Sequence, residues 1–445
     1  MTIRYAMMMN TYSKYIPITI SSNVSEATVA GIKENISKMP GVDITEEKQR
    51  VYFESDYFAH IIGYTGTISA DALSALKEED AGTPYTITDQ IGKTGIEKAF
   101  EDQLKGVKGS EKITINDSYR VINVVDRIEP TAGNDIYLTI DAELQEAYYK
   151  ILEKRIAGIL ISKLTNSHDA GTKGESATGI KVPIYDVYDA IVQNNVIDMS
   201  KLNKSKSSLS NDVLSKLNSA NGVTTNLLKQ ELKIGTNRYG KQISESLQDY
   251  LDYVYSMLVK KNIILTSNID KTDKKYIDFT NNKLSTSEFL TYAISKSWID
   301  LEILEIGDEY YSSEELYQKL LHYIFDYLKD DNEYKKLIYH DLIQEGTISG
   351  KEICLLLYEQ NVLKKGDALE EKLRSGQMDS FAFIKNKIRS LEITPGQLGL
   401  EPCSGSIVVT DVNTGKIKAM VSYPSYDNNK FANHVDSDYF NYIHI

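Results

Sequence analysis

Apolar residues recur at helical spacing through the middle of the chain. Residues three and four apart share one face of a helix, so such stripes predict amphipathic helices. No proline lies between residues 183 and 395. Because proline costs about 3 kcal/mol inside a helix, this long interval predicts an all-helical block. The clearest stripes are Ile243, Leu247, Leu251, Val254 and Leu258, and then Leu316, Leu320, Leu321, Ile324, Phe325 and Leu328.

In this block, helix starts are indicated by serines that are followed three residues later by a glutamate. This pattern is the capping box, in which the two side chains bond each other's backbone N–H groups. The many tyrosines of the block are expected to line helix-packing seams, since a tyrosine buries its ring and keeps its hydroxyl wet. Residues 199–226 are rich in Ser, Asn and Lys and are expected to form a mobile connection. The capping boxes are Ser285–Glu288, Ser312–Glu315 and Ser349–Glu352.

The two flanks hold all the prolines and read as mixed helix and strand. Ser25, Ser69 and Asp141 are expected to cap helices over residues 24–39, 69–80 and from 142 onward. Short alternating or extended stretches predict strands at residues 41–45, 113–115, 121–125 and 135–140. Near the end, residues 407–410 and 416–423 predict a hairpin closed by Gly415. The predicted fold class is therefore α+β: a mixed pedestal, an all-α insertion and an incomplete antiparallel sheet.

This last hairpin is hydrophobic on its alternating positions and needs more sheet and a covering layer. The rest of the chain does not obviously supply them. An exposed edge of this kind tends to aggregate. The orphan hairpin therefore leads us to expect a chain cut short at its C-terminal end.

Composition narrows the function classes. The 445 residues carry 63 acidic against 50 basic side chains, a net charge of −13, and no basic cluster suited to phosphate contacts appears. Nucleic acid is therefore not an expected partner. Six scattered histidines lack zinc-ligand spacing, so no metal is expected. Cys354 and Cys403 are too few for a disulfide framework, and spacing does not say whether they pair. No segment is long and apolar enough for a membrane helix, and residues 1–10 lack the features of a signal peptide.

Four segments, in order, are similar to class B penicillin-binding proteins, the peptidoglycan D,D-transpeptidases. The resemblance implies a pedestal, or dimerisation, domain followed by the opening strands of a transpeptidase domain. The helical block is outside the family pattern and reads as an insertion. The segments are His60-Ile-Ile-Gly-Tyr-Thr-Gly66, Asp89-Gln-Ile-Gly-Lys-Thr-Gly-Ile-Glu97, Gly133-Asn-Asp-Ile-Tyr-Leu-Thr-Ile-Asp141 with Leu144-Gln145, and Gly405 to Gly415 with Ala419 to Asp427.

The resemblance also implies an organisation and a chemistry. The pedestal would span residues 1–134, the first transpeptidase strand and helix 135–165, the linker and insertion 166–395, and the truncated hairpin 396–445. Family members cross-link peptidoglycan stem peptides through a serine acyl-enzyme, and β-lactams acylate the same serine. They use the motifs Ser-x-x-Lys, Ser-x-Asn and Lys-Thr-Gly. A membrane anchor holds them on the outer face of the bacterial plasma membrane.

Each of these motifs has a counterpart in the sequence that we reject as catalytic. Their order differs from that of the family, and they fall within too short a stretch to organise a transpeptidase domain around them. The carboxylates at 78–80 favour a charged Lys77, whereas a general base must be neutral. The counterparts are Ser74-Ala-Leu-Lys77, Ser21-Ser-Asn23 and Lys93-Thr-Gly95.

The family's nucleophile is expected downstream of Asp427, where no Ser-x-x-Lys follows. We therefore predict that the chain contains no catalytic, cofactor-binding or metal-binding residue and is inactive alone. Expected partners are the peptidoglycan synthesis machinery and a second copy through the pedestal. Stem peptides and β-lactams are expected only in the complete enzyme, whose anchor is missing here. The alternative is a catalytically silent interaction module, and an unrelated enzyme within the helical block is least favoured.

Overall fold

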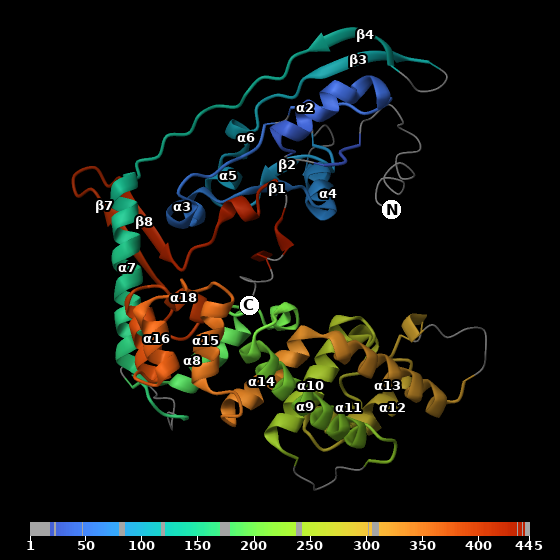
Figure 1. The fold of residues 1–445 in the computed structure, drawn as a ribbon. Coiled ribbons are helices and arrows are strands. Elements are labelled where there is room, and N and C mark those ends of the chain that lie inside the picture. Colours follow the sequence, from blue (N-terminus) through green and yellow to red (C-terminus); the bar gives the residue numbers. More distant parts are fainter. Residues whose placement is uncertain are drawn as a thin grey trace. The chain divides into compact units, whose positions relative to one another are not determined.

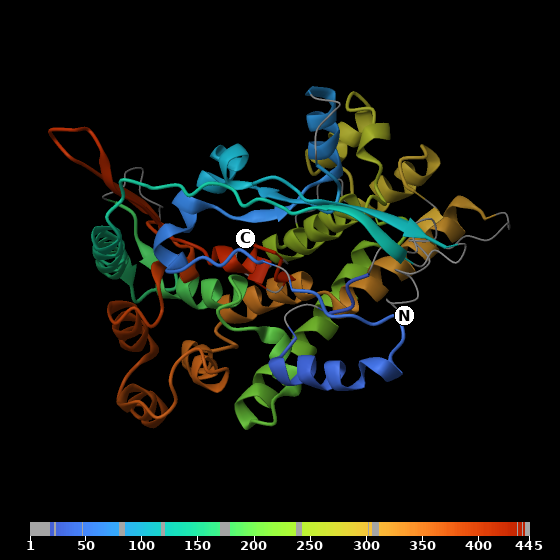
Figure 2. The same ribbon diagram turned by 90° about the horizontal axis from the view of Figure 1, so that it is seen from above.

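The computed structural model describes residues 18–21, 24–46, 48–79, 85–116, 121–169, 179–236, 243–300, 302–304, 311–433, 435–437 and 439–440. The chain divides into two compact units (Figures 1 and 2). Unit 1 comprises Met1–Lys150 and Ser406–His444, and unit 2 comprises Ile151–Gly405 together with Ile445. Unit 1 mixes helices with small sheets and unit 2 is mainly helical, so the predicted α+β class is confirmed.

Short elements make up unit 1, and the predicted helix caps are found there. Ser25 accepts a bond from the backbone of Thr28, and Ser69 and Asp141 do the same for Ala72 and Leu144. The helices are α2 (Glu26–Asn35), η1 (Ile36–Lys38), α3 (Ser55–Ile62), α4 (Ala70–Glu79), α5 (Gly95–Ala99), α6 (Glu101–Leu104), the start of α7 (Ala142–Lys163) and η5 (Asn428–Lys430). The strands are β1 (Thr65–Thr67), β2 (Gln90–Gly92), β3 (Ser110–Ile115), β4 (Val121–Ile128), β7 (Gly405–Thr410) and β8 (Ile417–Tyr423).

Strands β3 and β4 form an antiparallel two-stranded ribbon that packs little against the rest of unit 1 (Figure 1). Ser110 pairs with Ile128 and Ile115 with Val121, with two register shifts between. Every residue of β4 is exposed, including Ile122 at 67% and Val125 at 57%. The predicted strands are confirmed, but their apolar side chains lie on the surface.

Two strand predictions are wrong. Residues 41–45 and 135–140 contain no β-strand. The second segment is hydrogen-bonded to β8 near its end, where Thr139 Oγ1 donates to Ile417 O and Asp141 N donates to Lys418 O. Tyr137 is 90% exposed, so the alternation there reflects no buried face.

The hairpin of β7 and β8 is confirmed, with Gly415 at φ 71° in its turn. One face of β8 is covered, because α3 packs against this strand. Ala419, Val421 and Tyr423 are buried, whereas Val408 on β7 is 60% exposed. The chain therefore supplies part of the covering layer that the sequence did not reveal.

Unit 2 is a helical assembly around one apolar core. All three predicted capping boxes are present, and the stripes on α10 and α13 face the core. Among the described residues, no helix of the protein is long and apolar enough to cross a membrane. Besides the rest of α7 and the short strands β5 (Leu164–Thr165) and β6 (Val182–Pro183), unit 2 contains α8 (Ile184–Gln193), η2 (Met199–Lys204), α9 (Ser208–Glu231), α10 (Glu245–Lys260), η3 (Thr266–Asn268), α11 (Lys274–Thr280), α12 (Thr286–Ser295), η4 (Glu302–Leu304), α13 (Ser313–Asp330), α14 (Asn332–Gln344), α15 (Gly350–Glu359), α16 (Ala368–Ser375), α17 (Ser380–Arg389) and α18 (Pro395–Leu398).

The prediction of a mobile connection over residues 199–226 is wrong. The segment forms η2 and most of α9, a helix of 24 residues. Val213, Leu217 and Leu228 are buried at helical spacing, and Ser207 caps the helix start. The helix was not predicted because its few apolar residues are separated by many polar ones. The predicted linker at 166–179 falls largely on residues 170–178, which lie outside the described residues.

A helix ending recurs through unit 2. The helix is followed by a residue with positive φ, and two residues later an aliphatic side chain enters the core. In α15, Asn361 has φ 59°, Val362 N donates to Leu357 O and Leu363 is 2% exposed. This is a Schellman-type end, which satisfies carbonyls left over by the helix. The pairs are Asn195 and Ile197, Asn262 and Ile264, Ser297 and Ile299, Gly346 and Ile348, Asn361 and Leu363, and Leu391 and Ile393.

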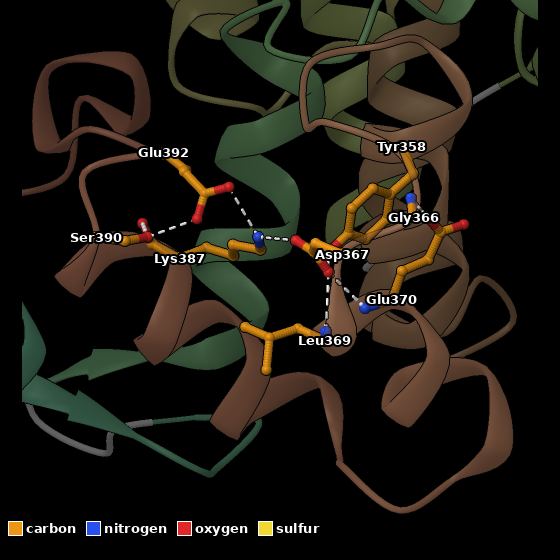
Figure 3. A network of polar contacts seen from close by, with 8 residues as sticks. All are labelled: Tyr358, Gly366, Asp367, Leu369, Glu370, Lys387, Ser390 and Glu392. Carbon is orange, nitrogen blue, oxygen red and sulfur yellow. Dashed lines mark hydrogen bonds and ion pairs between the residues drawn. The ribbon is translucent and has the colours of Figure 1, made fainter.

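Among the described residues, one charged side chain lies in the core of unit 2. Lys387 on α17 is 1% exposed, and its ammonium bonds Asp367 and, at 2.9 Å, Glu392 (Figure 3). Burial alone would lower the pKa of Lys387, but the two carboxylates outweigh burial and raise it. Asp367 also caps α16 through the backbone of Leu369 and Glu370. The network ties three consecutive segments together at one point.

Candidate functional site

The family-like segments converge on one seam within unit 1, between α3 with its following loop and the segment 424–433 after β8. His60 Nε2 lies 2.9 Å from Pro424 O, and Tyr426 Oη donates to Ala59 O at 3.2 Å. The His60 and Tyr426 rings meet edge to face at 5.2 Å. These contacts join the first quoted segment to the last one, across more than 360 positions of sequence.

Two asparagines dock the segment 424–433 onto the stretch before α3. Asn429 accepts from Tyr52 N at 2.8 Å and donates to Tyr52 O at 2.9 Å. Asn433 repeats the pattern with Arg50, at 3.3 and 3.0 Å. In each pair the asparagine amide bonds both the N–H and the C=O of one residue, as a neighbouring strand would do. The two pairs fix the register between segments that are far apart in the chain.

The neighbouring residues reinforce this register. Asn428 is fully buried and donates to Gly63 O at 2.7 Å. Ser55 donates to Asp427 at 2.8 Å and accepts from Asn428 N at 3.1 Å. The bond from Asn428 to the Gly63 carbonyl makes this docking specific, because removal of the side chain would leave a buried carbonyl without a partner.

A buried carboxylate lies behind the seam. Glu97 is 5% exposed and pairs with Arg50, whose Nε lies 3.0 Å from Oε1. Tyr52 donates to Glu97 at 3.3 Å and accepts from Thr65 N at 3.0 Å. Burial raises the pKa of Tyr52, and the nearby Glu97 charge adds to this, although the bond from Thr65 opposes it. Tyr52 therefore stays protonated, and its hydroxyl links the Thr65 amide to the Glu97 carboxylate.

Glycines allow the loop after α3 to touch the Lys93-Thr-Gly95 turn. Gly95 has φ 60°, and a Cβ there would lie 2.6 Å from Gly63 N. A Cβ on Gly63, at φ 75°, would lie 2.0 Å from Thr94 O. Only glycine fits at both positions. The Lys-Thr-Gly string is therefore a close backbone contact within the pedestal.

Gln145 at the start of α7 completes the seam. This residue is 1% exposed, and its amide donates to Tyr57 O and Met420 O at 2.8 and 3.0 Å and accepts from Met420 N at 2.8 Å. One side chain thereby bonds both α3 and β8.

The other catalytic look-alikes lie away from the seam. Ser74 is exposed on α4 and donates to Ala70 O at 2.9 Å within its own helix, and Lys77 is also exposed. Ser21 is exposed, while residues 22 and 23 of its motif lie outside the described residues. The arrangement at the seam can hold two segments together, and its hydrogen bonds are matched to backbone groups rather than to a reacting atom.

Residues 3–138 match the model of the family described as "Penicillin-binding Protein dimerisation domain". Over these residues the chain is similar to a penicillin-binding protein dimerisation domain. The resemblance read from the sequence is thereby confirmed, and the matched residues include α3, the Gly63–Gly95 contact and the Arg50–Glu97 pair.

Curated relatives share the same region. The peptidoglycan D,D-transpeptidase MrdA of Escherichia coli K12 is 32% identical over 173 residues, 39% of this chain and 26% of that protein. MrdA of Acinetobacter baumannii is 35% identical over 142 residues, covering 32% and 20%. Penicillin-binding protein 2A of Bacillus subtilis is 28% identical over 136 residues, covering 31% and 19%. The match spans about a quarter or less of the length of these relatives.

Solved structures give only loose superpositions. The complex between penicillin-binding protein PBP2 and MreC from Helicobacter pylori has a TM-score of 0.25 at 20% identity, covering 34% of this chain and 31% of that chain. Penicillin-binding protein 2B of Streptococcus pneumoniae has a TM-score of 0.26 at 16% identity, covering 62% and 57%.

Sequence reasoning found the segments but missed several residues that join them. Arg50, Tyr52, Asn429 and Asn433 were not singled out. The usable signal was the run Asp427-Asn-Asn directly after the predicted exit from the sheet, because asparagine side chains often bond backbone groups outside regular structure.

Proposed function

We propose that this chain is the pedestal-bearing, non-catalytic portion of a penicillin-binding protein that cross-links peptidoglycan in bacterial cell-wall synthesis. The observation that carries the proposal is the seam, where the family-like segments meet through buried side-chain to backbone bonds. Its role is to hold the opening strands of the transpeptidase domain in a fixed register on the pedestal.

The physical case rests on how such a hold works. The transpeptidase chemistry needs a serine, a lysine and two further motifs placed within fractions of an ångström. Gln145 bonds the backbone of Met420 within β8, and Asn429, which follows β8, bonds the backbone of Tyr52, so the strand has little freedom to slide. A pedestal built this way fixes the orientation of the segment that follows β8.

We further propose that no serine of this chain acts as the penicillin-reactive nucleophile. The test is labelling of the purified chain with a fluorescent penicillin, beside the complete gene product as the positive control. We expect a covalent adduct on the complete protein and none on this chain. An adduct on the chain that disappears in Ser74→Ala would overturn the assignment and make α4 the reactive element.

One observation favours a second candidate, the catalytically silent interaction module. The core-facing side of β8 is already covered by α3, so the hairpin is less exposed than its sequence suggested. Sequencing the DNA on both sides of the reading frame separates the two functions. A frame that continues into Ser-x-x-Lys, Ser-x-Asn and Lys-Thr-Gly supports the transpeptidase, and bounding stop codons support the module.

Partners and location follow as parts of the same proposal. We propose that the pedestal meets other proteins of the peptidoglycan synthesis machinery on the outer face of the plasma membrane, and a second copy of itself through the β3–β4 ribbon. The ribbon has no third strand among the described residues and exposes Ile122 and Val125. Sedimentation should show self-association that Ile122→Glu with Val125→Glu abolishes. Monomers at all concentrations would contradict the second-copy proposal alone.

A further inference from the structure

A hollow on unit 2 collects positive charge in a strongly acidic chain. It lies between the end of α9 and the middle of α13 and has a volume of about 460 Å³. Its lining residues are Lys229, Lys233, Gln318, Leu321, His322 and Phe325. No carboxylate is among the described residues that line it, although the whole chain carries a net charge of −13.

The simplest structural explanation for the two lysines is that they complement the negative end of the α9 dipole. Three carbonyl groups at this end already have other partners. Tyr317 donates to Leu232 O at 2.6 Å, Ser287 to Lys233 O at 3.0 Å, and Thr236 to Gln230 O at 3.1 Å. Hydroxyl groups therefore bond these three carbonyls, which do not need the lysine ammonium groups.

The lysines also lack carboxylate partners among the described residues. Lys229 instead lies over the Phe325 ring, with Nζ 5.5 Å from the ring centre. A cation over an aromatic face keeps its charge while its stem covers the ring. Lys233 and His322 are exposed beside it, and neither forms an ion pair with a described residue.

The walls of the hollow are fixed. Tyr317 is fully buried and its bond to Leu232 pins α13 to the end of α9. Leu320, Ile324 and Leu328 continue the buried face of α13, and the half-buried Phe325 lies at the edge of that face, beside Gln318 and the exposed His322. Leu321 and Phe325 are half-buried and give the hollow an apolar floor.

We propose that this hollow, defined by Lys229, Lys233 and His322 over Leu321 and Phe325, binds an oxyanion that carries an apolar group. The cations would hold a phosphate or carboxylate, and the floor would cover the apolar part. Such an anion can come from a phosphate ester or from a carboxylate, and the probes below distinguish the two. The site is independent of the function proposed for the pedestal.

The test is an NMR titration of the full chain with phenyl phosphate, benzoate and inorganic phosphate. We expect phenyl phosphate to bind with a dissociation constant in the millimolar range, as suits a few exposed charge contacts. Tighter binding of benzoate would assign the site to carboxylates, and tighter binding of phenyl phosphate to phosphate esters. Inorganic phosphate should bind several-fold more weakly, because it cannot use the apolar floor.

Charge variants decide whether the hollow is the binding site. Lys229→Glu with Lys233→Glu should weaken binding by about tenfold or more, while the matched exposed pair Lys364→Glu with Lys365→Glu should leave it unchanged. Lys229→Met with Lys233→Met serves as a second variant that keeps the packing of the stems. Absence of binding by both phenyl phosphate and benzoate at about 10 mM, or equal losses in both glutamate pairs, would overturn the proposal.

Discussion

The seam of unit 1 and the core of unit 2 are held together in opposite ways. At the seam, asparagine side-chain amides bond backbone groups that lie 365 to 383 positions away in sequence. In unit 2, apolar stripes pack against one another and the repeated helix endings are closed by neighbours in sequence. The comparison teaches that the seam is a docking device set by a few polar residues, whereas unit 2 is a core stabilised by many contacts.

This contrast predicts where single substitutions act most strongly. Among the described residues of unit 2, the buried side chain that carries a charge is Lys387, whose loss would leave Asp367 and Glu392 without their cation. We expect Lys387→Ala to lower the free energy of unfolding by about 3 kcal/mol. We expect a smaller loss of unfolding free energy than for a fully buried ion pair, because the Glu392 side chain is 40% exposed.

Urea unfolding at neutral pH measures this effect. Lys387→Met is the matched control, because it refills the volume without the charge. We expect the methionine variant to lose less than the alanine variant. A loss under about 1 kcal/mol for alanine would show that the carboxylates are solvated enough to need no partner.

At the seam, Asn429→Ala should cost about 2 kcal/mol, since it removes two bonds and leaves the buried backbone of Tyr52 unpaired. Asn433→Ala, at the exposed end of the seam, should cost less than half as much. Asn413→Ala in the exposed hairpin turn serves as the control and should stay within about 0.5 kcal/mol. Thermal unfolding of unit 1 measures all three, and equal effects at 429 and 413 would contradict the docking role.

The repeated helix endings predict a stabilising change. Ser297 occupies at φ 56° a position that Asn or Gly fills in most of the other copies. Because a left-handed backbone strains a side chain but not glycine, Ser297→Gly should raise the free energy of unfolding by about 0.5 kcal/mol. Ser295→Gly, two residues earlier inside α12, should lower it by a similar amount. Chemical denaturation of both variants tests the sign, and destabilisation by the first would refute the shared turn.

The smallest expected effect is a pH dependence between α8 and α14. His340 Nδ1 lies 3.0 Å from Asp189, and this bond, aided by the charges of Asp341 and Asp249, raises the pKa of His340 despite partial burial. A raised pKa means that the contribution to stability is complete below the unfolded value of about 6.5 and is lost as pH rises through the folded value.

Wild type and His340→Gln should therefore differ in unfolding free energy most at acidic pH, and converge above neutrality. The difference should be small, because His340 is 44% exposed. Asp189→Asn should remove the same pH dependence. A gap between wild type and His340→Gln that widens as pH rises would show that the sign is wrong.

The sequence predicted features whose cause is local. Capping boxes at Ser285, Ser312 and Ser349, and the hairpin turn at Gly415, depend on residues within a few positions of each other, so their patterns could be recognised. Helix α9 was missed because its apolar residues are sparse among Ser and Asn. The segments at the seam could be named by family resemblance, but not their contacts, since Asn429 reaches Tyr52 across 377 positions.

Hydrogen exchange at the backbone of Tyr52 tests the central claim most directly. The account predicts that the Tyr52 amide, which donates to Asn429, is strongly protected in the intact chain and loses that protection in Asn429→Ala, while the helices of unit 2 keep theirs. A Tyr52 amide that exchanges freely in the wild type, or that stays protected without the Asn429 side chain, would contradict the claim that the seam docks the segment after β8 onto the pedestal.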